Sequence, residues 1–133
     1  MSGLFVSIEG PDASGKSLVV SNLRKHIKDV VVVKQPGGTG LSAEIRRLIV
    51  SWHKDLEPST ELLLFFTSLV HLSKTVVKPA LAEGKLVVAD RWFYSLYAYQ
   101  LYSRGLGSKY EDLLTQMLET FDISFPDLNL IIS

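Results

Sequence analysis

The stretch GPDASGKS, Gly10 to Ser17, combines glycine, lysine and serine at a spacing that suits phosphate chemistry. It fits the pattern GxxxxGK[ST], and it stands between a run typical of a strand and a run typical of a helix. Gly10 and Gly15 let backbone N–H groups curl around an anion, Lys16 neutralises β- and γ-phosphates, and Ser17 offers a hydroxyl to magnesium. We therefore expect a nucleoside triphosphate here; the alternative is a turn that only links strand to helix.

A second candidate is LVVADRW, Leu86 to Trp92, an apolar run that ends in two charges. Parallel sheets form their binding crevices at the carboxyl ends of strands. Asp90 would hold magnesium, directly or through water, and Arg91 would bind a phosphate through its two-pronged guanidinium. The alternative is an ion pair on the surface.

The elements that must position these residues alternate along the chain. Short β-branched runs predict strands at 4–8, 30–33, 85–89 and 128–132, and apolar residues at helical spacing predict helices at 16–27, 42–50, 58–82, 93–102 and 110–121. Leu18 and Leu48 are expected on the buried faces of their helices, and Pro79 predicts a break near Lys78. This order indicates an α/β fold, a parallel sheet with helices on both faces.

Composition narrows the function classes. The chain has 133 residues, 47% of them hydrophobic, with a formal net charge of zero. These values favour one globular domain and argue against a polybasic nucleic-acid binder. The chain contains no cysteine, which excludes disulfides, thiolate metal sites and a catalytic thiol. The N-terminus predicts neither a signal peptide nor a membrane span, so a cytoplasmic location without membrane partners is expected.

Other polar residues suggest what receives the phosphoryl group. The chain lacks NKxD, and its DxxG pattern lies inside the phosphate loop, which argues against a guanine-nucleotide switch. Separate arginines, Arg46, Arg47, Arg91 and Arg104, suit a second phosphorylated substrate better than water. The three histidines share no ligand spacing and are not expected to bind metal.

Together these segments resemble thymidylate kinase of the bacterial and phage type, from Leu4 to the last residue. The resemblance rests on EGPDASGKS, KQPGGTG, AEIRRLIV, ELLLFF, VVKPALAEGKLVVADRW, AYQLYSRGLG and PDLNLIIS, which follow in the family's order. It implies a P-loop NTPase-type three-layer sandwich, with residues 1–133 forming one nucleoside monophosphate kinase domain. In the family the chain continues through a lid and a last strand, both expected beyond Ser133.

The resemblance also implies a reaction and its residues. The expected reaction transfers the γ-phosphoryl group of ATP, with Mg2+, to a deoxynucleoside monophosphate, converting dTMP to dTDP. The implied phosphate-binding residues are Gly10, Pro11, Asp12, Ala13, Ser14, Gly15, Lys16 and Ser17. The implied catalytic residues are Asp12, Lys16, Asp90 and Arg91, and the metal ligands are Ser17 and Asp90. The implied acceptor-binding residues are Gln35, Arg46, Phe65, Leu69, Arg91, Leu96, Tyr99, Gln100 and Arg104.

Several positions depart from the family. Gln35 stands where the family usually has Glu, Leu69 where the family has Arg, and Leu96 where the family has Ser, Thr or Asn. All three changes remove polarity from the implied acceptor pocket. Ala13 stands where the eukaryotic type has an arginine, so a lid is expected to supply that cation. Another or modified pyrimidine deoxynucleotide therefore stays open as the acceptor.

Some alternatives concern single residues and the assembly. Asp12 would either act near the transferred phosphoryl group or cap the turn. Of the adjacent Phe65 and Phe66, at most one is expected to stack on a base. A nucleotide-binding module without turnover is the alternative to a kinase. The family is usually dimeric, and the apolar segment Leu62 to Val77 offers a surface for a homodimer.

Overall fold

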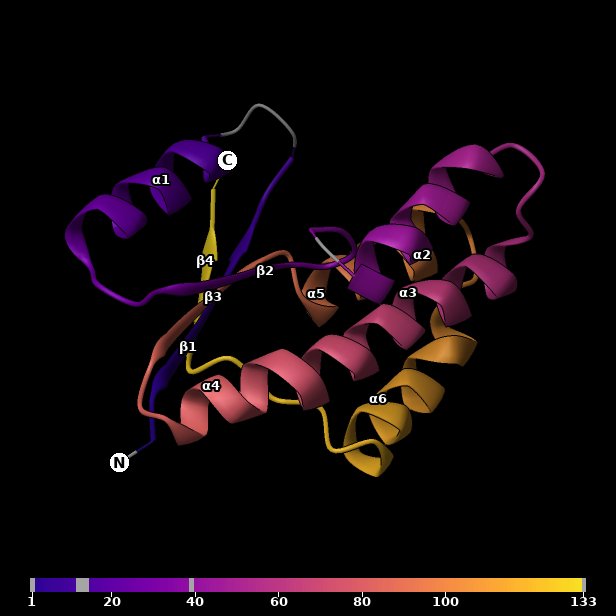
Figure 1. Ribbon diagram of the computed structural model, residues 1–133. Helices are drawn as coiled ribbons and strands as arrows, with labels where there is room; N and C mark the ends of the chain where they lie inside the picture. Colours follow the sequence, from indigo (N-terminus) through magenta and orange to yellow (C-terminus); the bar gives the residue numbers. More distant parts are fainter. Residues whose placement is uncertain (1, 12–14, 39, 133) are drawn as a thin grey trace.

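Four parallel strands form the centre of the molecule (Figure 1). The computed structural model describes residues 2–11, 15–38 and 40–132. The strands are β1 (Leu4–Glu9), β2 (Val31–Lys34), β3 (Leu86–Asp90) and β4 (Leu128–Ile131), in the spatial order β2-β3-β1-β4. Asp90 at the end of β3 lies in register with Ile8 on one side and Lys34 on the other. The carboxyl ends of three strands therefore meet at one edge of the sheet.

Alternate residues of the strands face two separate layers of helices. Val6, Ile8 and Val88 pack against helix α1 (Lys16–His26), whereas Phe5, Val33, Val87 and Ala89 pack in the larger core formed with the other helices. Figure 1 shows α1 apart from the group formed by α2 (Gly40–Ser51), α3 (Pro58–Leu72) and α6 (Glu111–Thr120). The expected α/β fold with helices on both faces is confirmed, and the period of two along each strand explains it.

The long apolar segment after Pro58 forms one continuous helical rod. It consists of α3, a π-helical turn η1 (Ser73–Val77) and α4 (Lys78–Ala82). Pro79 has no N–H to donate to the carbonyl four residues earlier, and the wider π-helical turn directly before α4 accommodates the proline. The break expected near Lys78 is therefore a local widening of a helix that continues. By length and composition this rod could cross a membrane, but 44% of its most apolar window is buried, and several of its residues lie in the core.

The rod begins at a well-defined residue. The side chain of Glu57 accepts hydrogen bonds from the backbone N–H groups of Ser59 (3.0 Å) and Thr60 (2.9 Å). A hydrogen bond from the Ser59 hydroxyl, together with these two backbone bonds, lowers the pKa of Glu57 to about 2. This cap fixes where α3 starts.

The remaining helices follow the sequence closely, with two corrections to the expected buried faces. The predicted segment 93–102 forms α5 (Phe93–Leu96) and a second π-helical segment, η2 (Tyr97–Ser103), and a short 3-10 turn, η3 (Ser108–Tyr110), precedes α6. Leu18 and Leu48 are wrong as buried residues, since they are 66% and 48% exposed. The sheet contacts a narrow stripe of α1, Val19, Val20 and Leu23, which leaves Leu18 outside.

Candidate active site

Helix α1 begins at the edge where the strand ends meet. Gly15, directly before the helix, has φ of 100°, which a residue with a side chain rarely adopts, and its carbonyl accepts the N–H of Val19 (3.1 Å). Lys16 is buried, and its Nζ lies 3.6 Å from Oδ1 of Asp90. The two stretches singled out in the sequence therefore meet in space. Residues 12–14, which include the candidates Asp12, Ala13 and Ser14, lie outside the described residues.

A cavity of about 370 Å³ opens over this junction. Gly15, Lys16, Ser17, Asp90 and Arg91 are among the residues that line it. Ser17 and Asp90 offer the oxygen ligands that Mg2+ prefers. Within the described ranges, no three His, Cys, Asp or Glu residues cluster as a metal site. The donor set thus fits an ion that takes few protein ligands and completes its shell with phosphate oxygens and water.

A second cavity, of about 760 Å³, adjoins the first. Both cavities are lined by Pro11, Gln35, Pro36, Arg46 and Arg91. Two guanidinium groups thus stand at the boundary, where they could bind phosphates on either side.

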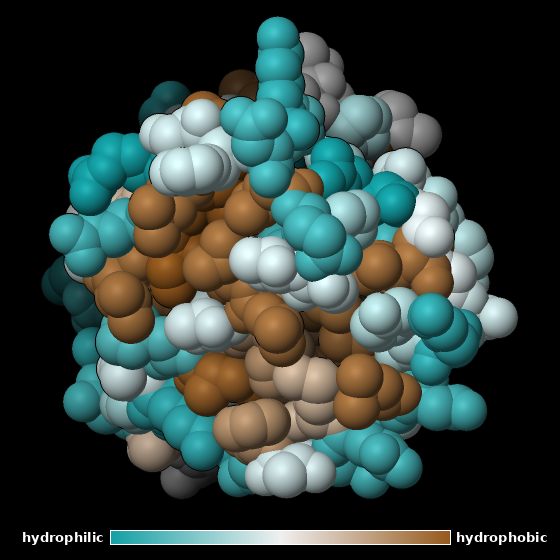
Figure 2. Space-filling view, turned by 90° about the vertical axis from the view of Figure 1, so that its right-hand side faces the viewer, coloured by the Kyte–Doolittle hydropathy of each residue, from teal (hydrophilic) through white to brown (hydrophobic). Residues whose placement is uncertain are grey.

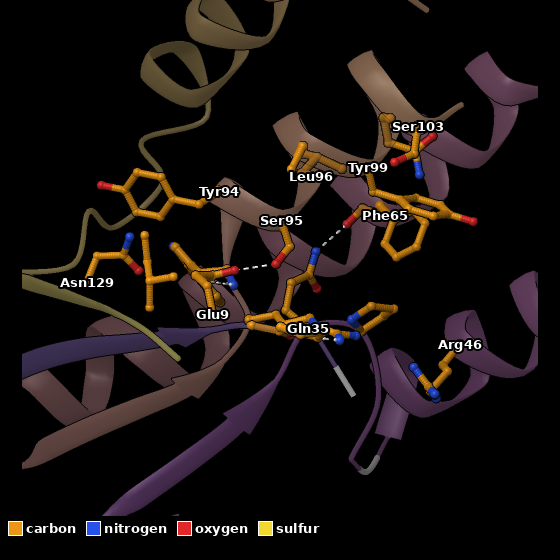
Figure 3. Close-up of a pocket in the computed structure, with 18 residues that line it drawn as sticks. Glu9, Gln35, Arg46, Phe65, Tyr94, Ser95, Leu96, Tyr99, Ser103 and Asn129 are labelled. Carbon is orange, nitrogen blue, oxygen red and sulfur yellow. Dashed lines mark hydrogen bonds between the residues drawn. The ribbon is translucent and has the colours of Figure 1, made fainter. Parts of the chain in front are cut away.

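Two aromatic rings border the larger cavity away from this boundary. Phe65 comes from α3 and Tyr99 from η2, and their ring centroids lie 6.2 Å apart at 66° (Figure 3). Phe66 points elsewhere: it is buried and packs on Phe121, with centroids 5.7 Å apart. A flat base could therefore stack on Phe65 and not on Phe66.

Two glutamines complete this part of the wall. Nε2 of Gln35 donates to the backbone carbonyl of Phe65 (2.8 Å), and Figure 3 shows the Gln35 side chain between Ser95 and Phe65. Nε2 of Gln100 donates to Oε1 of the fully buried Glu61 (3.0 Å). These bonds fix both side chains against the aromatic wall.

Arg104 does not line either cavity. Its Nε lies 3.3 Å from Oε1 of Glu61, and its Nη2 donates to the carbonyl of Leu56 (2.7 Å). The same Glu61 oxygen also accepts from Gln100, so Glu61 links the Arg104 side chain to the wall of the larger cavity.

The glycine-rich loop before α2 places Arg46. Gly37 has φ of 136°, and a Cβ atom there would lie 3.1 Å from Cδ of Arg46, so glycine permits the close approach. The Ser42 hydroxyl accepts the N–H of Gly37 (2.9 Å) and bonds to the Ser68 hydroxyl (2.7 Å), which ties loop and α2 to α3. Among the described residues, Arg46 has no acidic partner.

The two leucines that replace polar family residues occupy different places. Leu96 lies on the wall of the larger cavity and is mostly buried. Leu69 is fully buried in the main core and does not line the described cavities. The structure therefore does not bring Leu69 to the cavity in which the family resemblance placed it.

Sequence reasoning missed several residues of the larger cavity, among them Glu9, Tyr94, Ser95 and Asn129. Glu9 is 7% exposed, and burial raises the pKa of its carboxyl, although hydrogen bonds from Ser95 and Trp92 and the charge of Arg91 oppose this effect. One signal was available, since a carboxylate that ends a buried strand beside a phosphate loop needs partners.

Comparison with known proteins decides the family. The thymidylate kinase family model matches residues 8–133. The chain belongs to the thymidylate kinase family. A thymidylate kinase from Pseudomonas putida is 39% identical over a match that covers 98% of this chain and 64% of the relative. A thymidylate kinase from Chlorobium luteolum is 42% identical over a match that covers 77% of this chain and 50% of the relative.

A solved structure agrees with the sequence matches. The thymidylate kinase from Ehrlichia chaffeensis superposes with a TM-score of 0.85 and 30% identity, covering 100% of this chain and 72% of that one. The expected family and P-loop α/β fold are thus confirmed. The chain spans about half to two thirds of the length of these two curated thymidylate kinases.

Proposed function

We propose that this protein transfers the γ-phosphoryl group of ATP to the 5′-phosphate of a deoxynucleoside monophosphate, with dTMP as the acceptor that family membership indicates. The observation that carries the proposal is the shared boundary of the two cavities, where Arg46 and Arg91 stand. One cavity has the residues for a triphosphate and the other has aromatic walls for a base. Two phosphorylated substrates would meet at the arginines.

On the donor side, Lys16 would contact the β- and γ-phosphates, and Ser17 and Asp90 would hold Mg2+. When bound, Mg2+ neutralises phosphate charge and orients the triphosphate. An oxygen of the acceptor phosphate forms a bond to the γ-phosphorus, the bond from that phosphorus to the β–γ bridging oxygen breaks, and ADP leaves. Arg91 lines both cavities and would bind charge that shifts between donor and acceptor.

On the acceptor side, Arg46 would bind the monophosphate and Phe65 would stack on the base. Tyr99 would lie near the deoxyribose, and Gln35 and Gln100 near the edge of the base. Leu96 adds an apolar surface there. Support comes from the position of all six groups around one cavity.

The proposal extends to assembly and location. A homodimer is supported by exposed apolar side chains, Leu48, Trp52 and Leu63, on or beside α2 and α3. Figure 2 shows apolar side chains gathered on the face where these helices lie. A strictly monomeric mass in sedimentation at high concentration would contradict the dimer. The cytoplasm is the proposed location because ATP, the proposed donor, is available there.

The experiment couples ADP release to a panel of monophosphates: dTMP, dCMP, dUMP, dAMP and dGMP. ADP production that depends on a pyrimidine monophosphate supports the proposal, with dTMP expected to give the highest kcat/KM. ATP binding without ADP from any acceptor would contradict it and would indicate a binding module.

A further inference from the structure

The carboxylate of Glu9 joins the end of β1 to the turn that follows β3. Oε2 accepts the backbone N–H of Trp92 (2.9 Å), and Oε1 accepts the hydroxyl of Ser95. Trp92 is the residue directly before α5, at the N-cap position. Its indole side chain makes no capping hydrogen bond, because it has no acceptor atom for the N–H groups of the first turn. Figure 3 shows Glu9 and Ser95 joined at the side of the larger cavity. Glu9 therefore supplies, from another strand, the acceptor that the start of α5 lacks.

Arg91 directly follows β3 and directly precedes Trp92, and its backbone has φ of 67°. This left-handed conformation is unfavourable for a residue with a side chain, so surrounding contacts must hold it. Three successive residues of β1 and the loop do so. The carbonyl of Ile8 accepts the N–H of Arg91 (2.9 Å), the carbonyl of Gly10 accepts Nη2 of Arg91 (3.1 Å), and Glu9 holds the next N–H along the chain.

The same turn leads into the acceptor wall. Helix α5 continues into η2, and together they carry Leu96, Tyr99 and Gln100 to the larger cavity. A change in the direction of the turn would move the guanidinium of Arg91 and these side chains together. Misplacement by about 1 Å can lower rates by about a hundredfold.

We propose that Glu9 is a positioning residue, which sets Arg91 and the α5–η2 wall for acceptor binding. The proposal rests on the proposed function for the identity of the acceptor. A purely structural role is the competing explanation, and it predicts lower stability without a selective change in acceptor KM.

The test uses Glu9→Gln and Glu9→Ala in the full chain. Glutamine can accept the Trp92 N–H through Oε1 and donate to the Ser95 hydroxyl through Nε2, so it keeps both contacts without the charge. For Glu9→Ala we expect the acceptor KM to rise about tenfold or more and the ATP KM to change less than about threefold. For Glu9→Gln we expect both KM values within about threefold of the unchanged protein.

A matched control is Glu119→Ala, an exposed glutamate on α6, which should behave as the unchanged protein. Hydrogen exchange at the Trp92 amide gives a readout that needs no turnover: it should stay slow in Glu9→Gln and become about tenfold faster in Glu9→Ala. Calorimetric titration with dTMP reports acceptor binding independently of ADP release.

An unchanged acceptor KM or Kd in folded Glu9→Ala would overturn the proposal, as would equal losses in both variants. If Glu9→Ala does not fold, Glu9→Asp is the test variant. Its shorter side chain should raise the acceptor KM, and an unchanged acceptor KM in Glu9→Asp would overturn the proposal. If the unchanged protein neither binds nor phosphorylates any monophosphate, the proposed function itself fails.

Discussion

Nζ of Lys16 lies 3.6 Å from Oδ1 of Asp90, across the gap between the start of α1 and the end of β3. This ion pair holds the ammonium in place, although the two groups are far apart in sequence. Because the pair lies on the smaller cavity, Lys16 can contact a phosphate without leaving its position.

Lys16→Ala should abolish phosphoryl transfer while the fold stays intact. A positioned cation on the transferring phosphate typically contributes about a hundredfold or more to kcat. The measurement is ADP release at saturating ATP and dTMP, with circular dichroism as the check on folding. Retention of more than about a tenth of the rate would contradict this role for Lys16.

Phe65→Ala should weaken all pyrimidine acceptors together. Stacking on an aromatic side chain contributes about 1–3 kcal/mol per base, so acceptor KM values should rise about ten- to a hundredfold. The ratio of kcat/KM between dTMP and dCMP should stay constant, because stacking does not read ring substituents. Tyr102→Ala, at an exposed tyrosine that does not line the described cavities, is the control. A changed ratio would mean that Phe65 reads the base edge.

The sequence predicted the strands of the sheet and the start of α1 because both depend on local patterns. β-branched runs, glycines and the register of GPDASGKS specify strand, loop and helix without distant information. Glu9 was missed for the opposite reason: its partners Trp92 and Ser95 lie 83 and 86 residues away. A carboxylate at the end of a buried strand indicates that partners are needed, but the local sequence does not say which residues supply them. Leu69 was placed in the acceptor pocket by the family resemblance alone, and a resemblance does not say which neighbours cover the side chain in this chain, where Leu69 is fully buried in the core.

Glu9→Gln should change how stability depends on pH. Burial raises the pKa of Glu9 above 4.5, so its ionisation is less favourable in the folded chain than in the unfolded one. Its contribution to stability is complete below about pH 4.5 and decreases as pH rises through the raised pKa. The variant should therefore match the unchanged protein near pH 4 and have a higher Tm near pH 7. Equal Tm differences at both pH values, with Glu119→Gln as control, would disprove this.

Leu69→Arg should destabilise the protein, although the family usually has arginine at this position. Leu69 is fully buried in the main core, and an unpaired charge there would cost about 3–5 kcal/mol. Urea unfolding measures the loss, and Leu69→Met, which preserves the apolar volume, is the matched control. A folded Leu69→Arg protein of unchanged stability would show that the position reaches the acceptor cavity after all.

Leu96→Asn is the sharper test of base recognition, because Leu96 does line the cavity. The amide of asparagine can accept from N3–H of thymine and donate to O4, and after a half-turn it can donate to N3 of cytosine and accept from its 4-amino group. The variant should therefore raise kcat/KM for dTMP and dCMP together, by about three- to tenfold, since a net hydrogen bond contributes about 0.5–1.5 kcal/mol. Leu96→Met, which adds no hydrogen-bonding group, should leave both values within about threefold of the unchanged protein. Equal kcat/KM values in the two variants for both acceptors would remove position 96 from the set of residues that contact the base edge.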